Sequence, residues 1–89
     1  MTEQEILVRL EDIARRALRQ NDLRLTLETT AADVDGWDSL AHARLILQVE
    51  AGFGVVLPGA RLFDLDSVGA LVTLLQDLLG REPAAGAAG

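Results

Sequence analysis

Apolar residues return every three or four positions over residues 2–20, and this spacing predicts the first helix of the chain. Thr2 followed by Glu5 is the pattern of a capping box, in which each side chain accepts a backbone N–H at the helix start. Asn21 and Asp22 end the segment. The apolar side of this helix consists of Ile6, Leu7, Leu10, Ile13, Ala14, Ala17 and Leu18.

Residues 21–37 begin with leucines that alternate with polar residues, as in a β-strand. The leucines are Leu23, Leu25 and Leu27, and the only available partner for such a strand is the short apolar run at residues 55–57. We therefore favour a long ordered loop that inserts these leucines into the core, with a two-stranded pairing as the alternative. A loop this long in so small a domain is itself an indication of function.

A second helix is predicted from Asp38 or Ser39 to Ala51, with Gly52 as its end. Its apolar residues do not keep to one side. A helix that is apolar most of the way round is buried, or divides its surface between core, partner and ligand. One apolar stripe contains Leu40, Ala43 and Leu47, and the other contains Leu45, Ile46 and Val49.

The remaining chain predicts one short and one long helical segment. Asp66 and Ser67 provide an N-cap for a last helix, which is expected to run from Val68 to Gly80. Before it, residues 60–65 could form a single helical turn that carries three apolar residues, Leu62, Phe63 and Leu65.

The end of the chain differs in composition from the rest. Residues 81–89 are mainly Ala and Gly, contain Pro83 and show no periodicity, so we expect a disordered tail there. The patterns together predict a single all-α domain over residues 1–80.

Composition excludes several kinds of function. The 89 residues carry a net charge of -6, which argues against nonspecific nucleic-acid binding. There is no cysteine, hence no disulfide, zinc–thiolate site or cysteine nucleophile, and a single histidine cannot build a multi-histidine metal site. No segment resembles a membrane span or a signal peptide. We expect a cytoplasmic protein without a metal site, membrane contact or nucleic-acid partner.

Asp38, Ser39 and His42 contain the three residue types of a hydrolase triad, but they crowd into one helical turn and lack the nucleophile-elbow sequence. We therefore expect no catalytic residues. Ser39 itself has two interpretations. Asp38 and Ser39 can be an ordinary cap pair. Alternatively, a hydroxyl in the first helical turn can carry a phosphodiester next to free N–H groups and the positive end of the helix dipole.

The surroundings of Ser39 resemble the phosphopantetheine-attachment family, and its acyl carrier proteins in particular. The matching motif is Gly36-Trp37-Asp38-Ser39-Leu40, followed by an apolar helix. The likeness continues downstream in the same order and covers roughly residues 3 to 80. Its further landmarks are Glu50, Phe53-Gly54, Pro58 and Ser67-Val68.

This resemblance implies a four-helix bundle with a long first loop and a short third helix. It implies that a separate, magnesium-dependent phosphopantetheinyl transferase attaches 4′-phosphopantetheine from coenzyme A to Ser39, and that Asp38 supports the attachment. The arm would supply the thiol that the chain lacks, and acyl cargo would ride on it as a thioester. Leu40 would mainly anchor the helix start in the core.

The resemblance assigns partner docking and cargo shelter to the second and third helices. Docking through a row of acids is not expected here, because the second helix carries His42 and Arg44, and Glu50 is its one acid besides Asp38. Trp37 is expected to be a packed lid on the loop, and His42 a surface residue near the arm. Candidates for a cargo-facing lining, with plain core packing as an equal alternative, are Leu45, Ile46, Val49, Leu62 and Phe63.

We therefore predict a free-standing, monomeric acyl carrier protein of a polyketide-type or hybrid natural-product pathway. Its partners would be the transferase, an acyl-loading enzyme or acyltransferase, and a ketosynthase or tailoring enzymes. The first alternative is a stand-alone peptidyl carrier that bears an aminoacyl group; that class resembles a Gly-Gly-x-Ser-Leu motif, so Asp38 favours the acyl type. The second alternative is a helical interaction module that is never modified.

Overall fold

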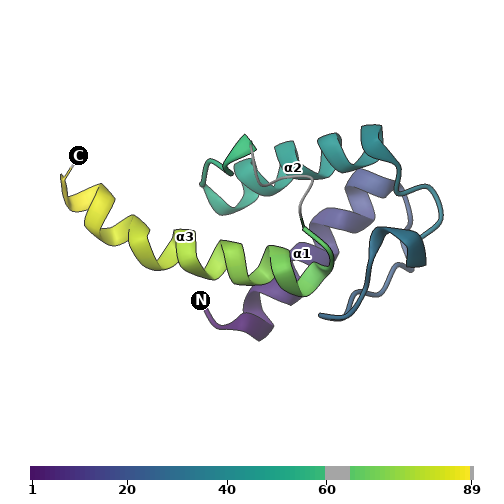
Figure 1. Ribbon diagram of the computed structural model, residues 1–89, viewed down its shortest axis with the longest axis horizontal. Coiled ribbons are helices and arrows are strands. Elements are labelled where there is room, and N and C mark those ends of the chain that lie inside the picture. Colours follow the sequence, from purple (N-terminus) through teal and green to yellow (C-terminus); the bar gives the residue numbers. More distant parts are fainter. Residues whose placement is uncertain (60–64, 89) are drawn as a thin grey trace.

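The computed structural model of the chain describes residues 1–59 and 65–88, and within them the fold is all-helical, without a strand. Three α-helices follow one another, α1 (Glu3–Leu18), α2 (Ser39–Phe53) and α3 (Val68–Ala88), and a 3-10 turn, η1 (Ala31–Asp33), lies in the first loop. Both α2 and α3 pack against α1. Figure 1 shows that they run in the opposite direction to α1, so their first turns lie near its C-terminal end.

The predicted capping box at the start of α1 is confirmed. The Glu5 N–H donates to the Thr2 hydroxyl at 3.1 Å, and the Thr2 N–H donates to the Glu5 carboxylate at 2.8 Å. The helix ends where Arg19 takes a left-handed conformation with φ 57°. The Arg19 N–H donates to the carbonyls of Arg15 and Arg16, so the helix ends without a glycine at its C-cap.

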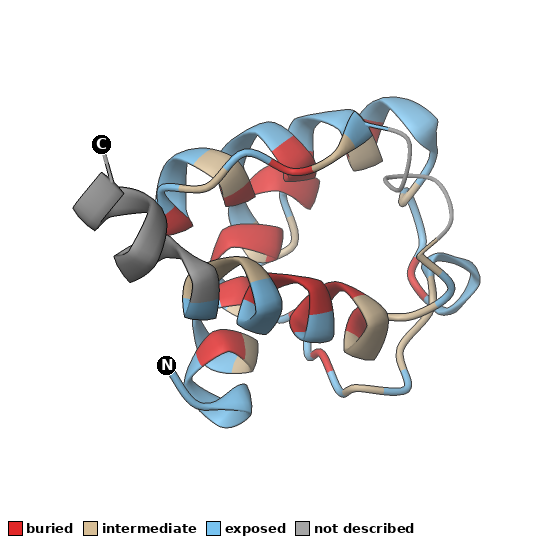
Figure 2. Cartoon of the chain, turned by 60° about the vertical axis from the view of Figure 1, so that its left-hand side comes forward, coloured by how far each residue is buried: buried red, intermediate tan, exposed pale blue. Residues whose placement is uncertain are grey.

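One hydrophobic core lies between the helices. The apolar side of α1 is buried as its spacing predicts, except for Leu7, which is half-buried. Figure 2 shows buried residues on the facing sides of all three helices. Leu23 and Leu25 from the first loop are buried in the same core. The main helical contributors, each buried, are Ile6, Leu10, Ile13, Ala14, Ala17, Leu45, Val49, Val68, Leu71, Val72 and Leu75.

The first loop is held by α1 rather than by a strand partner, as favoured above. Glu11 accepts the Leu25 N–H at 2.8 Å, and the Arg15 Nε donates to the Leu23 carbonyl at 2.8 Å. A salt bridge of 2.9 Å joins Glu11 to Arg15, so the same ion pair satisfies two backbone groups of the loop. The alternation of leucines therefore reflects side chains that point alternately to core and solvent in a loop that α1 fixes.

The end predicted for α2 at Gly52 is wrong, because the helix continues to Phe53. A Cβ at Gly52 would lie 2.8 Å from the Ile13 Cδ1, so this glycine serves close packing on α1. The helix ends at Gly54, which has φ 68° and donates its N–H to the Glu50 carbonyl at 2.9 Å. A left-handed C-cap is the position that glycine favours.

The end predicted for α3 at Gly80 is also wrong, because the helix runs to Ala88. A single glycine inside a helix costs about 1 kcal/mol relative to alanine but ends the helix only where the backbone turns left-handed. Gly80 has no positive φ. The division of the chain into a domain over 1–80 and a disordered tail over 81–89 stays a prediction, because the side chains of the tail lie outside the described residues.

The predicted short third helix is not tested by the structure. Its apolar residues Leu62 and Phe63 lie outside the described residues, and only Leu65, which is half-buried, is placed. The described part of the chain thus shows three α-helices and one 3-10 turn, and the fourth helix stays a prediction.

Candidate functional site

Asp38 caps α2 and leaves Ser39 as the first helical residue. The Asp38 Oδ1 accepts the Ala41 N–H at 2.8 Å, and the Asp38 carbonyl accepts the His42 N–H at 2.8 Å. The backbone of Asp38 is extended, with φ -96° and ψ -174°, as is usual at an N-cap. Because the carboxylate provides the cap, the hydroxyl of Ser39 is not needed for it.

Ser39 is exposed, and its hydroxyl has no hydrogen-bond partner among the described residues. The backbone N–H groups of Ser39 and Leu40 likewise have no acceptor in residues 1–59 and 65–88. These N–H groups stand at the N-terminus of α2, where the helix dipole is positive and anionic groups are favoured. The first turn of α2 can therefore stabilise a phosphate ester on the Ser39 oxygen.

The turn that leads into Ser39 is fixed by backbone geometry. Gly36 has φ 80°, a left-handed conformation that glycine adopts without strain. The side-chain amide of Gln20 donates to the Asp35 carbonyl at 2.6 Å and so ties this turn to the end of α1. The Trp37 N–H donates to the Val34 carbonyl at 3.3 Å. Ser39, the candidate attachment residue, therefore follows a turn that is bound to the end of α1.

Trp37 and His42 form a pair next to Ser39. The Trp37 Nε1–H donates to the His42 Nδ1 at 3.1 Å, and the rings stack with 6.2 Å between centroids and 25° between planes. An indole N–H can only donate, so the Nδ1 of His42 acts here as the acceptor. Both residues are half-buried, and Trp37 packs against the core as expected of a lid on the loop.

A small cavity of about 30 Å³ lies under this pair, between the first loop and the start of α3. Its walls include Trp37, His42, Asp66 and Leu71. Such a volume is enough for about one or two water molecules. The described residues therefore leave no room at this point for an acyl chain unless side chains move.

The residues predicted for a partner or cargo face divide into two groups. Leu45, Ile46 and Val49 are buried and pack in the core, which is the plain alternative stated for them. Leu40 is 68% exposed, so the expectation that it anchors the helix start in the core is wrong. The neighbouring Ala41 is buried in its place. The exposed outer side also carries Arg44, whereas Leu62 and Phe63 lie outside the described residues.

The first loop accepts hydrogen bonds from the first two N–H groups of α3 and so closes the start of this helix. The sequence did not predict this contact. The Val68 N–H donates to the Thr29 carbonyl and the Gly69 N–H to the Leu27 carbonyl, each at 2.8 Å. A Cβ at Gly69 would lie 2.8 Å from the Leu27 carbonyl oxygen. A glycine directly after the start of a predicted helix was the available signal for this close approach.

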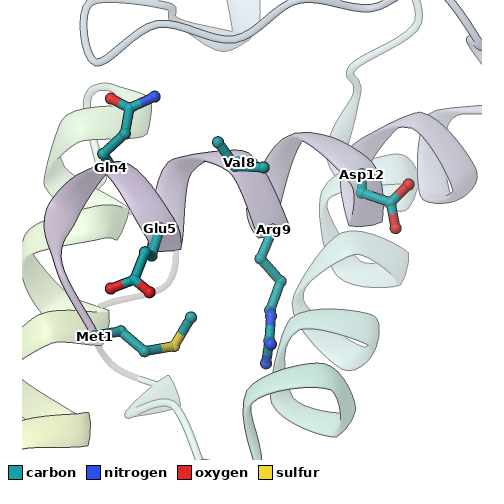
Figure 3. Close-up of a pocket in the computed structure, with 6 residues that line it drawn as sticks. All are labelled: Met1, Gln4, Glu5, Val8, Arg9 and Asp12. Carbon is teal, nitrogen blue, oxygen red and sulfur yellow. The ribbon is translucent and has the colours of Figure 1, made fainter.

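A larger, open hollow of about 510 Å³ lies on α1, where Figure 3 shows its lining side chains. Its lining residues run from Met1 to Asp12. Arg9 of this lining lies beside Phe53 at the last turn of α2, and none of the lining residues belongs to the first turn of α2. Its lining contains Glu5, Arg9 and Asp12 together with the apolar Met1 and Val8. It has no direct connection with the chemistry at Ser39.

In residues 1–59 and 65–88, no three His, Cys, Asp or Glu side chains come together as a metal site would require. None of the helices in that part of the chain has the length and apolar character that a membrane crossing requires.

Comparisons with known proteins show the family of the chain. Residues 8–84 match the profile of the phosphopantetheine attachment site family. The fold is similar to the solution structure of a holo acyl carrier protein from Geobacter metallireducens, with a TM-score of 0.81 and 35% sequence identity. That alignment covers 88% of this chain and 90% of the other. No curated protein sequence matches at a comparable level of significance.

Proposed function

The chain belongs to the phosphopantetheine-attachment family, as an acyl carrier protein, and from this premise we propose that Ser39 bears its 4′-phosphopantetheine and presents acyl groups as thioesters. The covalent 4′-phosphopantetheine itself follows from membership of the family. Such carriers are substrates of other enzymes and do not catalyse reactions themselves. The attachment position, the cargo and the pathway are the proposed parts.

One observation carries the assignment to Ser39. Its hydroxyl is exposed and unbonded among the described residues, and it stands beside two N–H groups that lack acceptors there. The nearby carboxylate of Asp38 is occupied with the cap through Oδ1. An enzyme can reach this hydroxyl without disturbing a hydrogen bond of the fold.

The proposed attachment is a phosphoryl-type transfer in the active site of a separate transferase. The Ser39 oxygen attacks the phosphorus of coenzyme A that carries the pantetheine, and a new oxygen–phosphorus bond forms. The pyrophosphate bond breaks, adenosine 3′,5′-bisphosphate leaves, and the hydroxyl proton passes to the transferase or solvent. The N–H groups of Ser39 and Leu40 then lie near the phosphodiester and favour its negative charge. When bound, the arm supplies the thiol that forms thioesters.

Asp38 is proposed to have two roles. It holds the first turn of α2 through its bond to the Ala41 N–H, and it offers negative charge next to Ser39 for the magnesium-dependent transferase. The hard oxygen ligands that Mg²⁺ prefers include carboxylates, so an acid adjacent to the reacting hydroxyl suits this partner.

We place the carrier, as a cytoplasmic monomer, in a polyketide-type or hybrid natural-product pathway. Its partners would be the transferase, an acyl-loading enzyme or acyltransferase, and a ketosynthase or tailoring enzymes. The exposed residues of α2 support this placement, since the only charge among them is Arg44 rather than a row of acids. A stand-alone aminoacyl carrier is the second candidate; isolation of the loaded protein from its own organism and measurement of the cargo mass distinguishes the two.

The test of the proposed function is attachment in vitro. The protein is incubated with coenzyme A, magnesium and a permissive phosphopantetheinyl transferase, and its intact mass is measured. We expect the wild type to gain the mass of one phosphopantetheinyl group and Ser39→Ala to gain none. An unchanged wild-type mass would leave the unmodified interaction module as the better description, and equal gains in both proteins would remove Ser39 from the site.

A further inference from the structure

Ser39 lies between two residues whose side chains bond to each other. Trp37 precedes it in the turn, and His42 follows it in the first turn of α2. The Trp37 Nε1–H donates to the His42 Nδ1 at 3.1 Å, and the two rings stack. This side-chain hydrogen bond therefore spans Ser39 and joins the chain on its two sides.

Two hydrogen bonds of Asp38 span Ser39 as well. The Asp38 carboxylate accepts the Ala41 N–H, and the Asp38 carbonyl accepts the His42 N–H, each at 2.8 Å. Neither the hydroxyl nor the backbone N–H of Ser39 adds a bond within residues 1–59 and 65–88. The position of Ser39 relative to the turn thus depends on the bonds that its neighbours make.

The turn that contains Trp37 is anchored on the side away from α2. The Gln20 side-chain amide donates to the Asp35 carbonyl at 2.6 Å, which binds the turn to the end of α1. The Trp37 N–H donates to the Val34 carbonyl, and the indole ring packs against the core. The hydrogen bond to His42 therefore connects an anchored turn to the first turn of α2.

The start of α3 is held by other means. Its first two N–H groups donate to backbone carbonyls of the first loop, whereas those of α2 have no acceptor in the described part of the chain. At α2, the contact with the preceding loop is made by the Trp37 and His42 side chains instead. This arrangement holds the helix start and leaves the N–H groups of Ser39 and Leu40 available to an anion.

We propose that Trp37 and His42 are positioning residues for the attachment reaction, because their hydrogen bond holds the first turn of α2 in the conformation that the phosphopantetheinyl transferase binds. The inference rests on the proposed function, since it requires that Ser39 is the residue modified. Both side chains act on Ser39 through the fold and not on the reacting atoms. The apparent affinity of a protein scales with the fraction of its molecules in the conformation that binds, so the pair lowers KM.

The transferase is the partner for which the position of Ser39 matters most. It forms a bond to the Ser39 oxygen, so its active site must hold that atom in line with the phosphorus of coenzyme A. Enzymes that act later react with the thiol at the other end of a flexible arm, which absorbs small displacements of Ser39. The effect of the pair is therefore expected in the attachment step.

The experiment measures attachment rates as a function of the concentration of the full chain, with coenzyme A, magnesium and a permissive transferase. A pH of about 8 is used, because an imidazole is ordinarily neutral there and can accept a hydrogen bond. His42→Phe retains a ring and removes the acceptor. We expect it to raise KM about fivefold, the factor that corresponds to one net hydrogen bond, while kcat stays within about twofold of the wild type.

Three further variants test whether the hydrogen bond itself is responsible. His42→Asn loses the ring but can place its side-chain oxygen near the position of Nδ1, so its KM is expected within about twofold of the wild type. Trp37→Phe removes the donor and should raise KM as His42→Phe does. Because both residues act through one bond, the double variant with Phe at both positions should have the KM of either single variant.

The matched control is Ser67→Ala, which removes a cap bond at the start of α3 and leaves the surroundings of Ser39 intact. We expect no change in KM from it. Backbone hydrogen exchange provides a second readout. In His42→Phe, the Ala41 N–H should exchange about fivefold faster than in the wild type, and the Ala70 N–H, which Ser67 holds, should exchange at the wild-type rate.

A raised KM for both single Phe variants, no further rise in the double variant and rescue by His42→Asn support the proposal. An unchanged KM for His42→Phe, additive effects in the double variant or an equal rise for Ser67→Ala overturns it, because the pair would then be a structural contact only. All of these variants retain the Ser39 hydroxyl and should reach the full mass gain at long times. A wild type that gains no mass would instead contradict the proposed function, before any variant is compared.

Discussion

The chain contains two serines, and each follows an aspartate at the start of a helix. In one pair the aspartate caps the helix, and in the other pair the serine does. At α2, the Asp38 carboxylate accepts the Ala41 N–H at 2.8 Å and Ser39 is left without a bond among the described residues. At α3, the Ser67 hydroxyl itself accepts the Ala70 N–H at 3.3 Å. Ser39 is exposed and Ser67 is half-buried.

The backbone N–H groups at the starts of α2 and α3 also differ in their surroundings. The first two N–H groups of α3 donate to the carbonyls of Leu27 and Thr29, whereas those of α2 have no acceptor in the described part of the chain. One helix start is therefore closed by the first loop, and the other is available to an anion. Similar dipeptides thus acquire a structural role in one place and a proposed functional role in the other, through their surroundings alone.

The largest effect on stability is expected from a side chain at the closed helix start. Gly69→Val places a Cβ within 2.8 Å of the Leu27 carbonyl oxygen and should lower the free energy of unfolding by about 1–3 kcal/mol, since the loop must move. Urea unfolding checks this. Gly80→Ala, which meets nothing within 4 Å, serves as the control and should be neutral or slightly stabilising. Equal behaviour of the two variants would contradict the closure of α3 by the loop.

Substitution of the two cap residues should give similar stability losses but different attachment. Asp38→Ala and Ser67→Ala each remove a cap and should each cost ~1 kcal/mol of unfolding free energy. Only Asp38→Ala should slow transfer of phosphopantetheine. Asp38→Asn separates the two roles, because asparagine caps about as well as aspartate. We expect it to keep stability while the rate falls about tenfold or more; a normal rate would leave Asp38 as a cap alone.

Loss of the Trp37–His42 hydrogen bond should have a smaller effect. His42→Phe retains a ring for stacking but removes the Nδ1 acceptor, which should cost ~1 kcal/mol in the free energy of unfolding. The chain has a single tryptophan, so its fluorescence reports directly on this pair. A spectrum and stability identical to the wild type would show that the pair does not hold the turn before Ser39.

The smallest effect is expected far from both serines, at the capping box of α1. The Thr2 backbone N–H that donates to the carboxylate of Glu5 lowers the pKa of this group below its ordinary value. A carboxyl group whose pKa is lower in the folded than in the unfolded protein stabilises the fold at pH values above its unfolded-state pKa. This stabilisation is lost as the pH falls through the folded-state pKa. Glu5→Gln should therefore show a weaker loss of stability on acidification than the wild type in urea titrations. Parallel pH profiles would contradict this.

Much of the fold could be predicted from periodicity. The apolar stripe of α1, its capping box and the starts of α2 and α3 follow from local sequence signals, and each is present in the structure. Helix ends were less predictable, because a glycine signals both close packing and termination. Gly52 packs on Ile13 and Gly54 ends the helix, and only three-dimensional contacts distinguish them.

The candidate site could be named from the sequence, but its surroundings could not be predicted. Ser39 and Asp38 stand out through their motif, whereas the exposure of Leu40 depends on the rotation of α2 against α1. Closure of the α3 start depends on contacts between residues about 40 positions apart, at Leu27 and Gly69, which no local pattern encodes. The sequence alone therefore could not explain why one Asp-Ser pair is open and the other closed.

The most direct test is to locate the phosphopantetheinyl group on the holo protein by tandem mass spectrometry of its tryptic peptides. Cleavage at arginine places Ser39 in the peptide 25–44 and Ser67 in the peptide 62–81. We predict that the group is found only on the first peptide and that fragmentation assigns it to Ser39. A group on Ser67, or on a threonine of the first peptide, would contradict the account.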